Sequence, residues 1–534
     1  MGKQKILFTI GVLFSIVSRG QTPEPNPSET KGQLHGNFQV LFQQYNPDSI
    51  IGAQVPDAEA AMNAYGNFTY TYGKVTAGLR FESYQNAILG FPGRFKGSGI
   101  GSRYVRYQND ELDITVGNFY EQFGNGMTFR SYWEPNLGID NAMDGVRIIY
   151  RPVKGLTTKA VYGQQRFDFD SRIVNGSGIV RGLDGEWDMN ETFSGLSEKP
   201  LKVKIGGSFV SKYQSGTTVS RDTNVFVLPN NVGCYGGRLG LTYKDFQLQG
   251  EYVTKINDPN ADNGYIYKKG HAVFANMAYS QKGFGITANA KFVDNMAFRS
   301  DRDALLFDVP INFLPAITRQ HTYNLAATLY PYATVLNGET GVSGELFYTF
   351  KKGSALGGKY STYVSLNVAA VNSLDTTHVG GREELINGYQ TNSVLFGKTK
   401  FVRDINLEIR KKISKSWSLT YVHYYFEFNT LVTPVTQDFK GLVYANVDVA
   451  EIQYKIAPKH AVRVELQSLL TKQDKGNWAT ALAEYTFSPH WTVSILDQYN
   501  YGNEDASKRV HYIFGNLGYT KGATRVMVGY GKRR

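Results

Sequence analysis

Residues 117–147 read GNFYEQFGNGMTFRSYWEPNLGIDNAMDGVR, and stretches of alternating polarity flank them on both sides. Before this segment, Leu112, Ile114 and Val116 alternate with polar residues or glycine, which is typical of a strand with one apolar face. After it, residues 146–150 repeat the pattern less cleanly. The roughly twenty residues between are rich in glycine, charge and aromatic rings, and loops of that length are usually functional or disordered. Because disordered segments are poor in aromatic residues, the sequence predicts a folded loop set on a sheet.

The same alternation continues through most of the 534-residue chain, with no shift in composition after residue 35. Residues 75–82, 405–410 and 462–467 each place apolar residues opposite polar ones. About two dozen such segments of about ten residues each, without helical segments between them, are the signature of a membrane barrel. The sequence predicts an all-β fold: one large, closed, antiparallel transmembrane β-barrel of about 24 strands (22–26), apolar toward lipid and polar toward the lumen.

The 117–147 segment also resembles a family of outer-membrane β-barrels of Bacteroidota whose function is unassigned. The resemblance is carried by FYEQFG, followed by Arg130, Glu134 and LGIDN, and by YPYATVLNGETG and FYTFKKGSALGGKY further along the chain. It implies a barrel fold and a location in the outer membrane of a Gram-negative bacterium. It implies no activity.

The N-terminal residues predict export. Residues 1–20 have a charged start, a short apolar run and small residues before a cleavage site, as in a secretory signal peptide. Residues 21–35 are polar and rich in proline, which predicts a flexible periplasmic lead-in. The barrel is therefore expected to occupy residues 36–534.

Turn lengths predict the orientation, since short turns of such barrels face the periplasm and long loops face outward. Counts made from the two ends of the chain disagree by one strand across 321–350. Either that stretch holds one long strand instead of two, or a strand lies hidden in the 296–320 loop. The expected strand at 526–530 runs outward and the sequence then stops at Arg534. Since such barrels have an even number of strands, we expect one more strand after Arg534 or an unusual closure.

The 122–144 loop is the candidate site, as a lumen or constriction loop. It brings both signs of charge together beside aromatic rings, and desolvated charges must be paired. One interpretation is a constriction or ligand site in which rings stack on a solute and charges select it. The other is a salt-bridged loop that braces the wall. The candidate residues are Glu121, Arg130, Tyr132, Trp133, Glu134, Asp140, Asp144 and Arg147.

The sequence offers little for catalysis or cofactor binding. Its eight histidines show no metal spacing and no pairing with a serine motif, so we expect no enzyme and no cofactor. Asp258, Asn260 and Asp262 partly match a calcium loop, but position 269, where a calcium loop needs glutamate, is lysine. An ordinary polar outer loop explains them as well. The net charge of +11 is dispersed over strands and turns, which argues against nucleic-acid binding.

Three functions stay open from the sequence. The first is a loop-gated channel for small or oligomeric solutes of unknown identity. The second is a structural or accessory barrel with lipoprotein or barrel partners in the outer membrane, and the third, more remote, is an outer-membrane hydrolase. A barrel of about 24 strands would be a wide leak if it were empty. We therefore expect inward loops, above all 122–144 and 296–320, or a partner to fill the lumen.

Overall fold

A computed structural model describes residues 31–221, 223–432 and 440–533. The predicted signal peptide and residues 21–30 of the predicted lead-in lie outside the described residues. The first strand, β1 (Gln33–Gln44), begins within the last residues of the predicted lead-in. No helix in the described ranges is long and apolar enough to cross a membrane.

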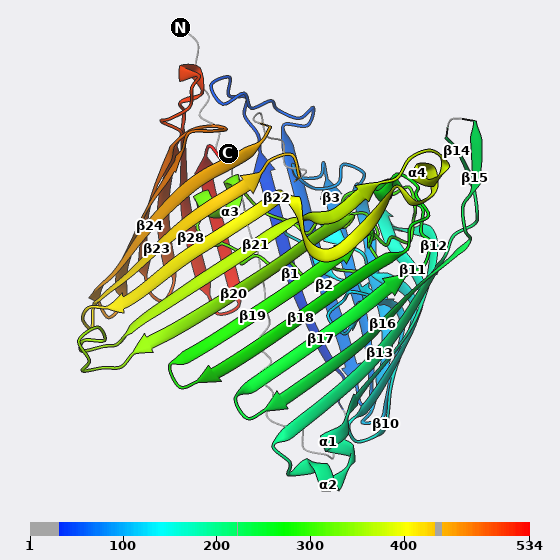
Figure 1. Ribbon diagram of the computed structural model, residues 1–534. Helices are drawn as coiled ribbons and strands as arrows, with labels where there is room; N and C mark the ends of the chain where they lie inside the picture. Colours follow the sequence, from blue (N-terminus) through cyan, green and yellow to red (C-terminus); the bar gives the residue numbers. More distant parts are fainter. Residues whose placement is uncertain (1–30, 222, 433–439, 534) are drawn as a thin grey trace.

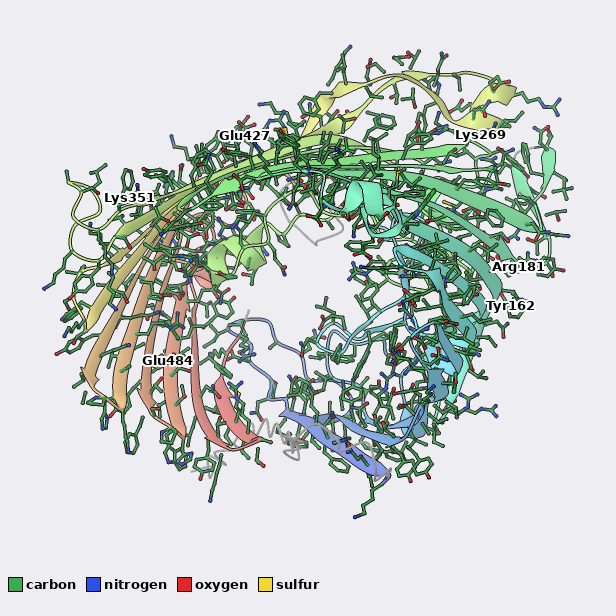
Figure 2. The ribbon with its side chains drawn as sticks, turned by 90° about the horizontal axis from the view of Figure 1, so that it is seen from below. Tyr162, Arg181, Lys269, Lys351, Glu427 and Glu484 are labelled. Carbon is green, nitrogen blue, oxygen red and sulfur yellow. The ribbon has the colours of Figure 1, made fainter. Side chains whose placement is uncertain are left out.

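The wall is one antiparallel sheet of 23 strands, a number inside the predicted range. Each strand pairs with the next wall strand along the chain, and Figure 2 shows that the sheet bends round into a ring. The strands after β1 are β2 (Ala60–Tyr72), β3 (Val75–Gln85), β4 (Gly97–Gln108), β5 (Leu112–Phe119), β10 (Met143–Val153), β11 (Leu156–Phe169), β12 (Ile173–Asp188), β13 (Leu201–Tyr213), β16 (Asn231–Tyr243), β17 (Phe246–Lys255), β18 (Gly270–Gln281), β19 (Phe284–Asp294), β20 (Gly338–Phe350), β21 (Thr362–His378), β22 (Tyr389–Lys412), β23 (Trp417–Asn429), β24 (Leu442–Ala457), β25 (His460–Thr471), β26 (Trp478–Phe487), β27 (Trp491–Tyr499), β28 (His511–Lys521) and β29 (Thr524–Gly531).

Smaller elements lie at the two rims or inside the ring. They are β6 (Gln122–Phe123), β7 (Phe129–Arg130), β8 (Trp133–Glu134), β9 (Ile139–Asp140), β14 (Thr218–Arg221), β15 (Asn224–Val227), α1 (Met189–Thr192), α2 (Ser194–Ser197), α3 (Asn324–Leu329), α4 (Arg382–Asn387) and two 3-10 turns, Ala261–Asn263 and Ala506–Lys508. In Figure 1 the rim with most of the short links, and with α1 and α2, lies at the bottom. The long loops, the β14–β15 hairpin and α4 lie at the top (Figure 1).

The strands β1 and β29 are the two ends of the sheet. Because every pairing between them is antiparallel and the number of strands is odd, both run toward the long-loop rim. The ladders of the described residues do not include a pairing between β29 and β1. Just beyond their upper ends, the Lys532 ammonium lies 2.5 Å from the Asp48 carboxylate.

The conflict over residues 321–350 is resolved in favour of a single strand. Strand β20 begins at Gly338, not near His321, and pairs with β19 on one side and β21 on the other. Residues 295–337 form one long inward segment that carries α3. Both counts from the chain ends were therefore right, and the error was to expect a strand before residue 338.

The two faces of the wall alternate as expected over much of the sheet. In β3, Leu79 and Phe81 are exposed on the outer face, while Arg80 and Glu82, which alternate with them, are buried on the inner face. This pattern follows from the period of two, which sends neighbouring side chains to opposite faces.

Part of the inner face is apolar, contrary to the expectation of a polar lumen. Helix α3 covers an inward apolar patch on β22–β25, and the two inward loop segments cover a second patch on β5–β19. The inner side chains under α3 include Val422, Tyr424, Phe426 and Phe428, each at most 5% exposed. Alternation identifies two faces but does not say which one is inside. Here the inward face is the apolar one, because the chain supplies a helix to cover it.

Candidate functional site

The predicted loop lies inside the ring, between β5 and β10, and is folded into two tiny strand pairs, β6–β7 and β8–β9. Strand β5, which leads into the loop, needs glycine at position 117, where φ is +102°. A Cβ there would come within 2.3 Å of the backbone carbonyl oxygen of Arg103. Phe123 and Phe129 are fully buried, with ring centroids 5.1 Å apart, and anchor the loop against the wall.

A buried charge network pins the far end of the loop to the wall. The Arg166 guanidinium donates to both Glu82 carboxylate oxygens at 2.7 and 2.8 Å and to Asp140 Oδ2 at 2.9 Å. Arg80 also donates to Glu82, at 2.7 Å, and to Asp140. The Tyr120 hydroxyl donates to Asp140 Oδ1 at 2.9 Å. Two cations and two carboxylates therefore balance, as buried charges require.

A second network joins the start of the loop to strands β5, β10 and β11. Arg147 donates to the Asp113 carboxylate at 3.0 Å and to Glu121 Oε2 at 3.3 Å. Lys159 donates to Glu121 Oε1 at 2.7 Å, and Arg106 makes a two-point contact with Asp113 at 2.6 and 2.8 Å. Pairing on this scale supports the bracing interpretation of the loop.

The other predicted residues divide between the lumen and the outer face. The Arg130 guanidinium lies 4.7 Å from the Tyr132 ring centroid and 4.1 Å from that of Phe313, and Arg80 lies 4.1 Å from the Trp133 ring centroid.

Glu134 accepts from a backbone amide in the turn after β8, and Asp144 points to the outer face of the wall. The Asp144 carboxylate contacts Arg103 at 3.4 Å and does not belong to the lumen cluster. Strand residues three apart face opposite sides, so Asp144 and Arg147 could not both point inward.

Sequence reasoning missed six charged residues of these networks: Arg80, Glu82, Arg106, Asp113, Lys159 and Arg166. The alternation of β3 places Arg80 and Glu82 on one face, but Arg166 lies on β11, and β3 and β11 are not neighbours in the sheet. The loop brings them together by laying Asp140 between them. No signal within a single strand predicts that contact.

A second inward segment, residues 295–337, joins the first. The backbone amide of Arg130 donates to Ile311 O at 2.8 Å, and that of Phe313 donates to Gly126 O at 2.9 Å. The buried Lys291 ammonium lies 2.5 Å from the Glu339 carboxylate at the base of this segment. We call these two hydrogen-bonded segments, 120–142 and 295–337, the lumen insert.

The partial calcium loop faces cations that belong to the protein. The buried Asp258 carboxylate lies 2.7 Å from the Lys212 ammonium and 3.1 Å from that of Lys255. Asp262 pairs with Arg299. Asn260 uses its side-chain amide as a donor to Asp258 and to a backbone carbonyl. These side chains are thus engaged in contacts that hold the loop to the lumen insert.

Two cavities adjoin the lumen insert. One, of about 340 Å³, has Arg80, Arg106, Arg147, Tyr120 and Trp133 in its lining. The other, of about 430 Å³, lies beside α3. Its lining includes Tyr323, Asn324, Glu451, Arg463, Glu465, Ser494, Asn516 and Arg533. Both present charge and hydrogen-bonding groups to a solute.

Comparison with solved structures returns bacterial outer-membrane proteins at low identity. The siderophore receptor PirA of Pseudomonas aeruginosa is 11% identical, with 98% of this chain and 79% of that chain covered and a TM-score of 0.39. OpdK of the same species, crystallised with vanillate, is 10% identical, with 94% and 96% covered and a TM-score of 0.33. A BenF-like porin of Pseudomonas fluorescens Pf-5 is 9% identical, with 94% and 97% covered and a TM-score of 0.33.

The sequence comparisons concern the whole chain. No curated protein matches it. A family of unknown function, DUF6029, matches residues 3–534, and the chain belongs to that family.

Proposed function

We propose that the protein is an outer-membrane channel in which the lumen insert narrows the passage of small or oligomeric polar solutes. The observation that supports this most directly is the position of the insert. In Figure 2 the insert lies along the inside of the ring, and the middle of the ring is clear of the side chains that are drawn. An insert that narrows the lumen without filling it is what a selective channel requires.

The inner wall beside α3 is suited to polar solutes. Arg463 donates to Glu451 at 3.1 Å and to Glu465 at 2.8 Å, all on the inner face of β24 and β25. Glu484 is a third carboxylate near Arg463, at 3.7 Å, so the carboxylates here outnumber the guanidinium groups even when Arg533, which also lines the cavity of about 430 Å³, is counted. We infer that this part of the lumen favours cations over anions.

Membrane location is supported by the outer face of the wall. Aliphatic side chains exposed on that face occur on strands around the ring, for example Leu183, Leu239, Leu346, Leu466 and Leu517. In water such a surface would be an association hazard, whereas in lipid it is the expected surface of a barrel.

The test is single-channel conductance of the purified protein in a planar bilayer, with reversal potentials measured across a salt gradient. We expect steady conductance, and we expect Glu451→Gln with Glu465→Gln to shift selectivity toward anions. Asp497→Asn is the matched control, because that carboxylate lies on the outer face, paired with His511, and should leave selectivity unchanged. Silence of the intact protein would refute the channel. A selectivity shift in the control equal to that in the lumen variant would refute the assigned lining.

An accessory barrel is the second candidate, supported by the outer rim. The hairpin β14–β15 projects beyond the wall in Figure 1, with Val225 and Val227 exposed at 65% and 73%. It is braced where Arg221 donates to the backbone oxygens of Gly264 and Leu385. A silent intact protein that conducts once residues 124–142 are deleted would make the insert a plug and would favour this function.

A further inference from the structure

The outer face of β23 and β24 carries a cluster of ionisable side chains. His423 Nδ1 lies 2.9 Å from Asp448 Oδ1, and the Tyr421 hydroxyl donates to the same oxygen at 2.7 Å. The His423 and Asp448 side chains are 39% and 42% exposed. Nearby, Lys400 donates to Glu427 at 2.8 Å, and Figure 2 shows Glu427 on the outside of the ring. We call this set the outer polar patch.

The His423–Asp448 pair lies within the wall and not at a rim, whereas Glu427 lies near the end of β23. His423 is at the middle of β23, and the row of paired outward residues through it continues with Leu407 and Leu366 on one side. Ile405 and Leu466, also exposed, flank the patch on β22 and β25. The outward pair of His511 and Asp497 differs, because it sits at the strand ends beside the outer loops.

A lipid environment does not suit this patch. A charged side chain on the lipid face near the bilayer midplane costs up to about 2–4 kcal/mol, less for carboxylates. Ionisable residues at such depth usually mark a functional contact. Packing explains why the inward face of β23 is apolar and its outward face polar, because the apolar side chains of β23 pack against α3 inside the ring. It does not explain why the outward positions hold histidine, aspartate and glutamate and not small or aliphatic residues.

We propose that the outer polar patch is the contact surface between two copies of this chain, related by a two-fold axis along the membrane normal. Two copies inserted in the same direction can be related by such an axis, and a two-fold contact must be complementary to itself. His423 and Asp448 are directly paired neighbours on β23 and β24. An axis between these strands places His423 opposite the partner copy's Asp448, and Asp448 opposite the partner copy's His423.

Two further features fit a protein partner of this kind. The patch holds both signs of charge, so two copies attract each other without a third component. Tyr425 and Tyr444 lie on the same outward face beside Tyr421 of the patch, and tyrosine is enriched where protein interfaces are most buried. The inference rests on the membrane location proposed above and does not depend on conduction.

The test is thiol crosslinking of full-length protein in isolated outer membranes. Cys234, the one native cysteine, is fully buried, so Asn446→Cys adds a single accessible thiol to the patch. A short bifunctional thiol reagent should yield a species of twice the chain mass. Leu239→Cys, outward on β16 and 46% exposed, is the matched control and should stay monomeric.

A second variant separates contact with a copy from contact with lipid. His423→Leu with Asp448→Leu, in the Asn446→Cys background, should reduce the crosslinked fraction at least about tenfold, the effect of about 1.4 kcal/mol of lost association energy. If the patch meets lipid instead, the leucines leave crosslinking unchanged and raise the resistance of the monomer to unfolding.

The other outcomes of the crosslinking experiment also test the proposal. A membrane-bound protein that stays monomeric, or crosslinks to a protein of another mass, overturns the inference and leaves the channel proposal standing. A protein that is absent from the membrane fraction overturns the membrane location itself.

Discussion

Replacement of Arg166 by methionine tests the bracing of the lumen insert. The Arg166 side chain is fully buried and holds Glu82 on β3 and Asp140 on the insert at 2.7–2.9 Å. Methionine fills much of the space but carries no charge and no donor. After the substitution, Arg80 alone would face two buried carboxylates.

The expected loss of unfolding free energy follows from the contacts that Arg166 makes. Three hydrogen bonds to carboxylates, at about 1.5–3 kcal/mol each, set an upper bound of about 5–9 kcal/mol. Both carboxylates keep Arg80, and each keeps a tyrosine hydroxyl, from Tyr84 or Tyr120, so part of that energy remains. Removal of one partner of a buried ion pair costs about 3–5 kcal/mol, and we expect Arg166→Met to fall in that range.

The assay is urea unfolding of the refolded protein in detergent micelles, read from the midpoint and slope. Arg103→Met is the control, because that guanidinium is half exposed and lies 3.4 Å from its carboxylate on the outer face. We expect a loss of less than about 1 kcal/mol there. Addition of Glu82→Gln to Arg166→Met restores neutrality, and the two changes should couple favourably by about 0.5–3 kcal/mol. A loss below about 1 kcal/mol for Arg166→Met would show that water already solvates these charges, and would refute the reasoning.

Three further substitutions test other parts of the fold. Phe123→Ala should cost about 3–5 kcal/mol and should raise conductance by loosening the insert, measured by unfolding and in bilayers; unchanged values in both would contradict the packing assigned to it. Asp258→Asn leaves two buried lysines without their carboxylate, so we expect the free energy of unfolding to fall by about 3–5 kcal/mol. Urea unfolding measures this loss, and added calcium, as a control, should not change the stability of the unmodified protein. The hydrogen bond from Lys532 lowers the pKa of Asp48, so its contribution is present near neutral pH and is lost as pH falls through that lowered pKa. Lys532→Gln should therefore narrow the stability difference between about pH 7 and pH 3, and an unchanged difference would rule out this contact.

The architecture could be predicted because strand alternation is a local property. The pattern in residues 75–82 placed Leu79 and Arg80 on opposite faces, as found. The same pattern could not decide which face of β23 points inward. Tyr424 and Phe426 point inward and are buried under α3, which lies about a hundred residues earlier in the chain.

The candidate loop was found, but its partners were not. Aromatic content and mixed charge identified residues 117–147, and the structure places Glu121, Asp140 and Arg147 in paired networks. Arg166 and Glu82 lie on strands that do not adjoin each other, so their contact depends on how far the ring curves and where the loop folds back. Single-strand patterns carry no information on either quantity.

The backbone hydrogen bonds between Gly126 or Arg130 and residues 311–313 have a consequence for assembly. They join segments on opposite sides of eight wall strands, so they can form only after much of the sheet has been threaded and curved. Contacts between distant parts of a chain form slowly, because loop-closure entropy opposes them. We therefore expect the ring to pass through a wide, unobstructed state during biogenesis. A variant that slows the formation of these hydrogen bonds would make the outer membrane transiently permeable and so harm the cell, even where the mature protein is normal.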